Sequence, residues 1–482
     1  MNATTLDAAA ADTARRNKLV INLLLVSSFV VILNETIMSV AIPPLMASLG
    51  VTAAAAQWVT AAFLLTMAVV IPMTGFLMQR LHTRTVFLTA MSLFSLGTVA
   101  AAIAPDLELL VAARVIQASG TAIMMPLLMT TVMTLVPPET RGKTMGDIMM
   151  VISVAPAIGP VLSGAILNYL HWRWLFVLVL PFALGSLWLG WRRIENVTTP
   201  RKAPLDVASV VISILAFGGS VYGLSVLGVP PAPGQPPAWA PLAIGGIAMI
   251  VFVQRQLKLQ RSDSALLDLR VFASRNFVVC LLMMVLLMLT LFGTIILLPI
   301  YLQNVLGIST LMTGLLLCPG ALLMGRLGQK VGGWYDRIGP TKLVVPGVMI
   351  VTAVLWAMTQ LGTQSRVEYI LIGHVIMCIG FALLFTPLFT ASLSSVPPQL
   401  YSHGSAVLGS LQQVAGASGV ALFIAIMTAQ QAKLAATGVV TVEALAGGIR
   451  AAFLAGAIGA VFAVACAFFV RKPDAPAMPA AH

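Results

Sequence analysis

A carboxylate and a guanidinium are predicted to lie at the same depth inside segments that are otherwise apolar, and together they could exchange protons. Glu35 is the one acidic residue well inside its apolar run, and Arg114 lies eight residues into another run. Counted from the nearer end of each run at 1.5 Å per helical residue, both lie roughly 12 Å deep. Because an isolated charge is costly in lipid, we expect both to face one wet interior and to interact. A proton on Glu35 would then weaken its hold on Arg114 or on a cationic substrate; the alternative is a static pair that only fixes two helices.

Four further residues extend this candidate site. His374 stands 260 residues after Arg114, and a histidine can change charge near neutral pH. It is either a second proton-coupling residue or a neutral, hydrogen-bonded packing residue, and the sequence leaves both open. Asn34, Gln117 and Met377 are expected to line a substrate cavity, although Gln117 could equally serve to hold two helices together. We predict no catalytic residue.

The composition indicates that the solvent of this chain is a lipid bilayer. The chain has 482 residues, of which 59% are hydrophobic and 9% charged, and its mean hydropathy is +1.00. This is too apolar for a water-soluble globule. The apolar runs are long enough to span about 30 Å of hydrocarbon as helices, and they lack the short alternating pattern of a β-barrel. The sequence predicts an all-α integral membrane protein with fourteen transmembrane helices, near residues 19–43, 54–77, 85–104, 107–135, 144–170, 174–192, 206–228, 239–257, 276–301, 310–330, 342–361, 367–390, 404–430 and 449–470.

An internal repeat organises these helices. Residues 107–138 return at 367–398 with a constant offset of 260, which places Gly380 opposite Gly120 and His374 opposite Arg114. Matches at offsets of 257 to 260 continue along the chain and place Gly293 opposite Glu35. The first six spans therefore correspond to the last six in the same direction, and spans seven and eight are an insertion. We predict a cytoplasmic tail (1–18), a six-helix bundle (19–193), a linker with two inserted helices (194–257), a cytoplasmic loop (258–275), a second six-helix bundle (276–470) and a cytoplasmic tail (471–482).

The distribution of basic residues predicts the orientation. With the N-terminus inside, 22 lysines and arginines fall in cytoplasmic segments, including Arg201 and Lys202, and only Arg173, Arg366, Lys433 and Arg450 fall in outer loops. This bias places both termini in the cytoplasm and the protein in the cell membrane as a multi-pass protein. It also explains the net charge of +12 without a nucleic-acid partner, because the cations are spread over many short loops. Cys280, Cys318, Cys378 and Cys466 stand singly, so neither a metal site nor a disulfide framework is predicted.

Several motifs occur in an order that carries a family resemblance. They are GFLMQR at 75–80 followed by Arg84, RVIQASG at 114–120, APAIGPVLSG at 155–164, HWRW at 171–174, and NETI at 34–37 with Ala41-Ile42-Pro43. With these, the chain resembles the major facilitator superfamily in its 14-helix drug:proton antiporter branch. Within that branch it is most similar to the lincomycin-resistance and multidrug exporters. The resemblance covers nearly the whole chain. The family often has an acidic residue where Asn34 stands, so assigning that role to Glu35 assumes a shift of one residue.

The resemblance also assigns conformational roles. Pro156 and Pro160 each remove a backbone donor while Gly159 and Gly164 allow close approach, so this span is expected to kink and to pack tightly. In the family this motif is associated with export. In the loop motifs the corresponding residues are Gly75, Gln79, Arg80 and Arg84 in the first half and Asp336 and Arg337 in the second.

These loop motifs and one helix cap have physical interpretations. Asp336 is expected to clamp a neighbouring helix end or a loop arginine. Gln79 stands where the family has an aspartate, which weakens the case for a charge-based latch in the first half. Asp206 is expected to cap the seventh span.

Three classes of function remain to be compared. The resemblance implies a proton-coupled efflux transporter that exports lipophilic drugs or drug-like compounds, lincosamides among them, by alternating access between two bundles. The alternative is a dedicated proton-coupled transporter of one physiological metabolite. A membrane-embedded enzyme is not expected, because it would need an ionisable cluster at membrane depth or an added soluble domain. The expected partners are a small-molecule substrate, protons and the bilayer, with no cofactor; in a Gram-negative cell a periplasmic adaptor and an outer-membrane channel would join them.

Overall fold

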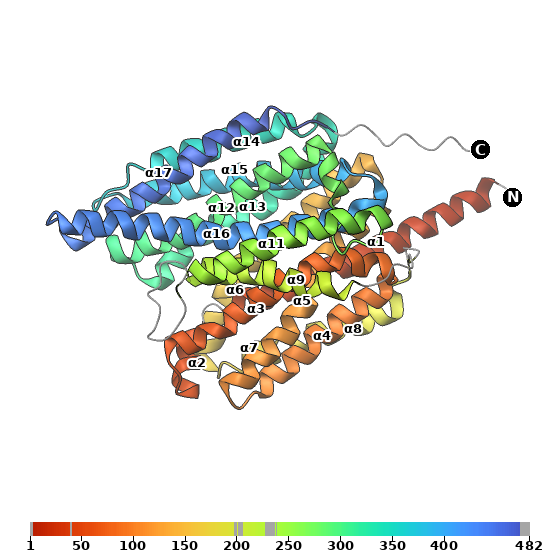
Figure 1. Ribbon diagram of the computed structural model, residues 1–482, viewed down its shortest axis with the longest axis horizontal. Helices are drawn as coiled ribbons and strands as arrows, with labels where there is room; N and C mark the ends of the chain where they lie inside the picture. The colour runs from red at the N-terminus through yellow and green to blue at the C-terminus, as the bar shows by residue number, and fades with distance from the viewer. Residues whose placement is uncertain are drawn as a thin grey trace.

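The chain folds into long helices that run in both directions through one slab (Figure 1). The computed structural model describes residues 3–38, 41–196, 200, 206–226, 237 and 239–472. In that part of the chain, 14 helices are long and apolar enough to cross a membrane, which confirms the predicted all-α fold. Arg201, Lys202 and the tail from residue 473 lie outside the described residues. The helices are α1 (Ala3–Ile37), α2 (Ile42–Leu49), α3 (Ala53–Arg80), α4 (Thr83–Ile103), α5 (Leu107–Leu135), α6 (Arg141–Tyr169), α7 (Trp174–Val177), α8 (Leu180–Arg193), α9 (Val207–Ser213), α10 (Gly219–Val226), α11 (Trp239–Leu259), α12 (Arg275–Ile300), α13 (Thr310–Ile338), α14 (Thr341–Met358), α15 (Val367–Ser394), α16 (Tyr401–Ala436) and α17 (Thr441–Ala467).

The helix ends follow local sequence signals more closely than hydropathy. Asp106 caps α5 by accepting a hydrogen bond from the backbone of Leu109, and Ser274 caps α12 in the same way through Phe277. α13 runs to Ile338, eight residues beyond its predicted end. Arg326 and Lys330 end the apolar run there, but they are good helix formers and do not end the helix.

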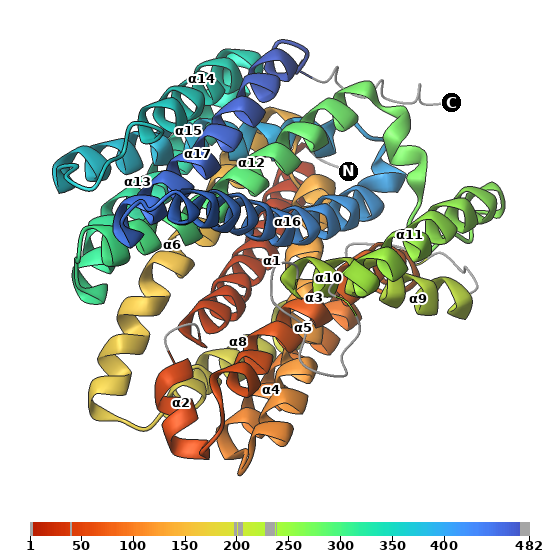
Figure 2. The ribbon, with the colours of Figure 1, turned by 60° about the vertical axis from the view of Figure 1, so that its left-hand side comes forward.

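The two halves of the chain repeat the same packing. In the first half α4 and α3 both pack on α5, and α1 packs on α6. In the second half α14 and α13 both pack on α15, and α12 packs on α16. Each pair corresponds to its counterpart in the repeat, so the fold is two pseudo-symmetric six-helix bundles. Figure 2 shows the first bundle (red to yellow) beside the second (green to blue).

Two seams join the bundles, and the repeat relates them to each other. α6 packs on α13 along one seam, and α3 packs on α16 along the other. Because α6 corresponds to α16 and α3 to α13, each seam is the same helix pair with the bundles exchanged. Arg80, Arg141 and Arg337 lie at one end of these seams, which we call the basic end.

The two inserted helical spans form a hairpin against the α3–α16 seam. α9, a turn of π-helix (Ile214–Gly218) and α10 make one arm, and α11 makes the other. Asp206 caps α9 as predicted, by accepting from the backbone of Ser209, and also accepts two hydrogen bonds from Arg255 at 2.7 and 2.8 Å. The hydrogen bonds from Arg255 lower the pKa of Asp206 to about 2, so the carboxylate stays ionised and the ion pair stays intact at neutral pH. Gln256 donates to Ser209 Oγ at 2.8 Å beside this pair.

Two glycines that correspond in the repeat allow close helix approaches, one in each bundle. At Gly120 of α5, an added Cβ would lie 2.7 Å from the backbone nitrogen of Phe94 on α4. At Gly380 of α15, it would lie 2.7 Å from Cγ2 of Val351 on α14. Both distances are shorter than van der Waals contact. At Gly120 the obstacle is backbone, so this position requires glycine, whereas at Gly380 the nearest atom belongs to a side chain.

We expect Gly120→Ala to destabilise the protein, because backbone atoms of α4 cannot yield as a side chain can. Overpacking of this kind costs about 1–3 kcal/mol. Thermal unfolding of the purified protein in detergent measures it as a lower melting temperature. Gly164→Ala is the matched control, since no atom lies within 4 Å of its added Cβ; it should leave the melting temperature unchanged or raise it. Equal effects of the two substitutions would contradict this packing.

Candidate functional site

A buried arginine organises the polar centre of the first bundle. Arg114 on α5 is fully buried, and its Nη1 donates to Asn34 Oδ1 of α1 at 3.1 Å and to Gln117 Oε1 at 2.5 Å. Its Nε donates to the carbonyl of Val59 on α3 at 3.4 Å, and its Cζ lies 4.0 Å from the centroid of the Phe63 ring. The guanidinium therefore joins three helices and is held by neutral oxygens and a ring face, with no carboxylate in direct contact.

This network continues toward α4 and leaves one donor group unused. Gln117 Nε2 donates to Thr98 Oγ1 at 2.7 Å, and Thr98 in turn donates to a carbonyl of its own helix. Nη2 of Arg114 is buried and has no hydrogen-bond partner in the described part of the chain. A buried, unsatisfied charged donor is costly, so Arg114 retains capacity to bind an additional acceptor such as a carboxylate, a water or a substrate oxygen.

Glu35 lies beside this network and does not close it. Asn34, Glu35 and Thr36 are successive residues of α1, and successive helical side chains point about 100° apart. Asn34 faces α5, while Thr36 faces α6 and donates to the carbonyl of Ala155 at 3.5 Å. Glu35 points between these two helices, is partly exposed, and interacts with Arg114 electrostatically without a direct ion pair. The expected interaction between Glu35 and Arg114 is therefore electrostatic. Arg114 donates its hydrogen bond to Asn34 instead, because depth along a helix does not fix the side that a residue faces.

The second bundle keeps the scaffold of this site without its charges. His374, opposite Arg114 in the repeat, contacts the carbonyl of Leu317 on α13 through Nε2 at 3.2 Å. This is the equivalent of the Arg114 contact with α3, and since a carbonyl can only accept, Nε2 carries the hydrogen. Met377 replaces Gln117 and is buried, and a Cβ on Gly293, opposite Glu35, would lie 2.5 Å from the ring of Phe423. The geometry favours the packing role of His374 over a second proton site.

The α6–α13 seam is clamped at the basic end by a carboxylate. Asp336 near the end of α13 accepts a hydrogen bond from the backbone of Gly142 at 2.8 Å and another from Lys143 at 2.9 Å. These are unsatisfied donors in the first turn of α6, where the helix dipole also favours a negative charge. Of the two partners expected for Asp336, a helix end and a loop arginine, the structure shows the helix end. Gln329 adds a hydrogen bond across the same seam to Asp147 at 3.0 Å.

The α3–α16 seam is closed without that charge. Gln79, opposite Asp336 in the repeat, donates through Nε2 to the carbonyl of Gln399 at 3.0 Å. Gly75 lies against Ser402 and the imidazole of His403, since an added Cβ would lie 2.8 Å from His403 Nδ1. The two seams pair corresponding helices but use different side chains. The α6–α13 seam has the carboxylate of Asp336, and the α3–α16 seam has the amide of Gln79 and the imidazole of His403.

The remaining basic residues of the loop motifs lie at the surface of the basic end. Arg80 lies over the ring of Phe76 with its Cζ 5.9 Å from the centroid, and Arg84 donates to the carbonyl of Trp191 at 2.5 Å. Arg337 is exposed at the end of α13. The contacts of Arg80 and Arg84 stabilise loop ends of the first bundle.

The motif of α6 only partly behaves as expected. Pro156 and Pro160 lie within one continuous helix and are exposed. Gly159 packs closely on Thr36 of α1, since an added Cβ would lie 2.9 Å from Thr36 Cβ. The expected tight packing at Gly164 is wrong, because no atom lies within 4 Å of its added Cβ. Gly164 lies on the far part of α6, beyond the region where the bundles touch.

The bundles touch near the basic end and part beyond it. The clamps described above join residues 142–147 to residues 329–336, and Gly325 still contacts Val154. Farther along, α6 exposes Val161 and Tyr169, the latter by 88%, and α13 exposes Leu311 by 77%. The structure is thus closed at the basic end. The α3–α16 seam continues to a hydrogen bond from Gln413 to Met67 Sδ at 3.7 Å, and the far parts of α6 and α13 are exposed.

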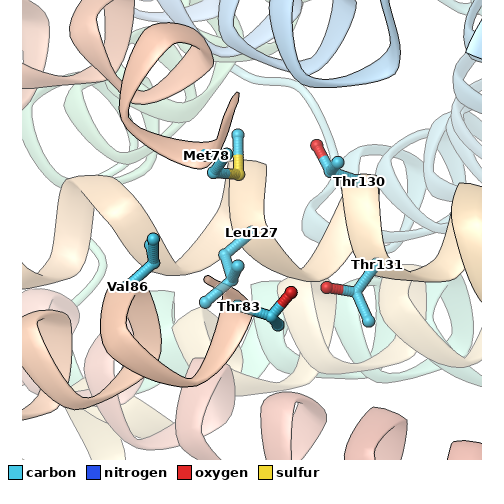
Figure 3. Close-up of a pocket in the computed structure, with 6 residues that line it drawn as sticks. All are labelled: Met78, Thr83, Val86, Leu127, Thr130 and Thr131. Atoms are coloured by element: carbon cyan, nitrogen blue, oxygen red, sulfur yellow. The ribbon is translucent and has the colours of Figure 1, made fainter. Parts of the chain in front are cut away.

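A small cavity at the basic end cannot be the substrate site. It has a volume of about 10 Å³ and is lined by Met78 of α3, Thr83 and Val86 of α4, and Leu127, Thr130 and Thr131 of α5 (Figure 3). That is room for about one water, whereas pockets for drug-sized molecules measure roughly 300 Å³ or more. In the described residues no group of three or more His, Cys, Asp or Glu side chains could hold a metal ion.

The sequence analysis did not single out His403 or Thr98. His403 follows Lys143 by 260 residues, so the repeat marks it as the counterpart of a basic residue at a helix start. That signal could have identified His403. Thr98 gives no comparable signal, because a threonine in an apolar helix most often bonds to its own backbone.

Two six-helix bundles related by a parallel internal repeat are typical of a secondary membrane transporter. The chain belongs to the Major Facilitator Superfamily, whose model matches residues 24–420. It is 38% identical over 464 residues to YcnB, an uncharacterized MFS-type transporter of Bacillus subtilis (strain 168), covering 95% of this chain and 96% of that protein. It is 36% identical over 456 residues to the lincomycin resistance protein LmrB of the same strain, covering 93% and 95%. The fold is similar to the crystal structure of the human organic anion transporter MFSD10, with a TM-score of 0.65 at 15% identity, covering 94% and 99%.

Proposed function

We propose that this transporter is a drug:proton antiporter that exports lipophilic, drug-like compounds. The observation that carries the proposal is the position of Glu35, a partly exposed carboxylate on α1 beside the buried Arg114. Because Asn34 and Gln117 hold the guanidinium, Glu35 can change its protonation state or its partner without breaking the scaffold. An intramembrane carboxylate with that freedom is suited to bind either a proton or a cationic group of a substrate.

The transport cycle follows from this competition. With the basic end in the cytoplasm, as the excess of lysine and arginine on that side favours, the structure corresponds to the outward-facing state. In this state Glu35 takes a proton from outside and releases its cargo. After the bundles rock, Glu35 gives the proton to the cytoplasm and binds new cargo, so each export event is driven by an inward proton.

The relatives support drug export in general and lincosamides in particular. The proteins named for lincomycin resistance are similar to this chain over almost its whole length. The few charges in the membrane interior suit amphipathic cargo better than sugars or phosphates. We therefore propose lincosamides as the first substrates to test, together with lipophilic dyes and quaternary amines.

Everted vesicles from an efflux-deficient host test the coupling. We expect a substrate added to vesicles with an acid interior to dissipate part of the pH gradient, read with a fluorescent amine, in vesicles that contain the protein and not in empty ones. Active extrusion without any movement of protons would contradict antiport. A growth panel in the same host decides between drug export and a dedicated metabolite transporter: protection against none of the compounds would favour the metabolite.

A further inference from the structure

His403 lies where the α11–α12 connection and the α3–α16 seam both contact one imidazole. It lies near the start of α16 at the basic end and is 2% exposed. Its Nδ1 accepts a hydrogen bond from the backbone of Asp268 at 3.2 Å. Since the backbone N–H is a donor, Nδ1 must be unprotonated in this state, and the ring is neutral with its hydrogen on Nε2.

The segment that contacts His403 is itself fixed to the inserted hairpin. Asp268 belongs to the connection between α11 and α12, and that connection places Leu266 and Leu267 in the core. Gln256 of α11 accepts hydrogen bonds from both of their backbone nitrogens, at 2.8 and 3.2 Å. Gln256 thus fixes the backbone directly before Asp268, and this holds the Asp268 N–H against the ring.

The first bundle closes over the same imidazole. Gly75 of α3 lies so near that an added Cβ would be 2.8 Å from Nδ1 and 3.2 Å from the Cα of His403. Gly75 and His403 belong to different bundles, so separating α3 from α16 at the basic end uncovers the ring. The imidazole is shielded from water only while this seam is shut.

The charged groups around His403 would do little to stabilise a positive charge on the buried imidazole in the closed state. Asp268 and Arg270 act on it electrostatically, but Arg270 already binds the Asp268 carboxylate at 2.5 Å and Asp263 at 2.5 Å. On the other elements nearby, Arg141 of α6 lies over the Tyr401 ring and donates to backbone carbonyls, and Arg80 of α3 lies over Phe76. A proton on Nδ1 would therefore oppose an N–H group with no free carboxylate beside it.

We infer that His403 is a second proton-binding site, loaded from the basic-end solution when the α3–α16 seam opens, and that it must lose this proton before the seam can shut. The proton binds at Nδ1 and later returns to the same solution, so the exchange needs no other reactant. Acidification on this side holds the protein open at the basic end. Given the proposed antiport, on which this consequence rests, import of protons would slow the return of the carrier and limit its own acidification of the cytoplasm.

A distance measurement across the basic end tests the site without any substrate. Spin labels at Glu139→Cys and Lys342→Cys, both exposed and on different bundles, report opening in a chain whose four native cysteines are replaced by alanine. Glu35→Gln is included so that the coupling carboxylate does not titrate. Uptake of one proton by His403 only in the open state should raise the open-to-closed ratio by about tenfold between pH 7.5 and 5.5.

His403→Asn is the decisive variant. The Asn side-chain oxygen, like Nδ1, is attached to Cγ, so it can accept from Asp268 N–H but cannot titrate. We expect its open fraction to be independent of pH, whereas His171→Asn, at the opposite end, should keep the full response. Gly75→Ala should open the seam at every pH, which shows that the labels detect this seam even if His403→Asn folds poorly. A pH response in His403→Asn equal to that of the parent chain would overturn the inference. The distance measurement does not depend on antiport. If a drug drives no proton movement in vesicles, antiport is contradicted while the test of His403 still stands.

Discussion

Glu35→Gln is expected to abolish proton-driven efflux while the protein still reaches the membrane. Glutamine has nearly the same shape as a protonated glutamate, so the hydrogen bond from Arg114 to Asn34 and the packing of α1 on α6 should persist. What is lost is the ability of this position to release a proton or to hold a cationic group. Efflux of a fluorescent substrate from energised vesicles should fall to the level of vesicles without the protein.

The design separates loss of coupling from loss of fold. Exchange of a cationic substrate should also be lost in Glu35→Gln, because the neutral amide corresponds to the protonated state that releases cargo. An unchanged melting temperature in detergent would show that the fold is kept. Glu108→Gln, an exposed acid at the start of α5, is the matched control and should transport normally. Unchanged uphill efflux by Glu35→Gln would remove Glu35 from the coupling role.

Asp336→Ala is expected to shift the protein toward the state that is open at the basic end. The substitution removes a carboxylate from two backbone donors at the start of α6. A charge at a helix N-terminus in a partly buried place contributes about 1–2 kcal/mol, and a change of that size alters the closed-to-open ratio by roughly 5–30-fold. The spin-label distance between positions 139 and 342 measures this ratio directly.

The other seam provides the comparison. Gln79→Ala removes a single neutral hydrogen bond to Gln399, so its shift should be smaller than that of Asp336→Ala. Equal shifts would mean that the carboxylate contributes no more than an amide, which contradicts the clamp.

Composition and the internal repeat predicted the architecture, because both reflect constraints that the bilayer places on the number, length and direction of the helices. Hydrocarbon thickness sets the length of each apolar run, and an even insertion preserves the direction of the second bundle. These constraints do not depend on side-chain packing. The helix ends were less accurate, as α13 shows, because a helix can continue into water after its apolar run has stopped.

The polar centre could be predicted in content but not in its contacts. Counting residues gave the depth of Glu35 and Arg114, yet a rotation of about 100° per residue decides which side chain faces α5. That rotation depends on how α1 packs, and it made Asn34 the partner. The prediction of tight packing at Gly164 was wrong for a related reason. Whether a glycine contacts another helix depends on how far along their length the bundles pack against each other. The contacts of His403 could not be predicted, because Gly75 and Asp268 come from parts of the chain that are distant from it in sequence.

The central claim is that the two bundles share a scaffold, while the residues that couple transport to protons, Glu35 and Arg114, lie in the first bundle. Release of protons on addition of substrate to the purified protein in weakly buffered detergent, read with a pH dye, tests this most directly. We expect release of protons by the wild-type chain and by His374→Asn, and none by Glu35→Gln. Release that persists in Glu35→Gln, or that disappears in His374→Asn, would contradict it.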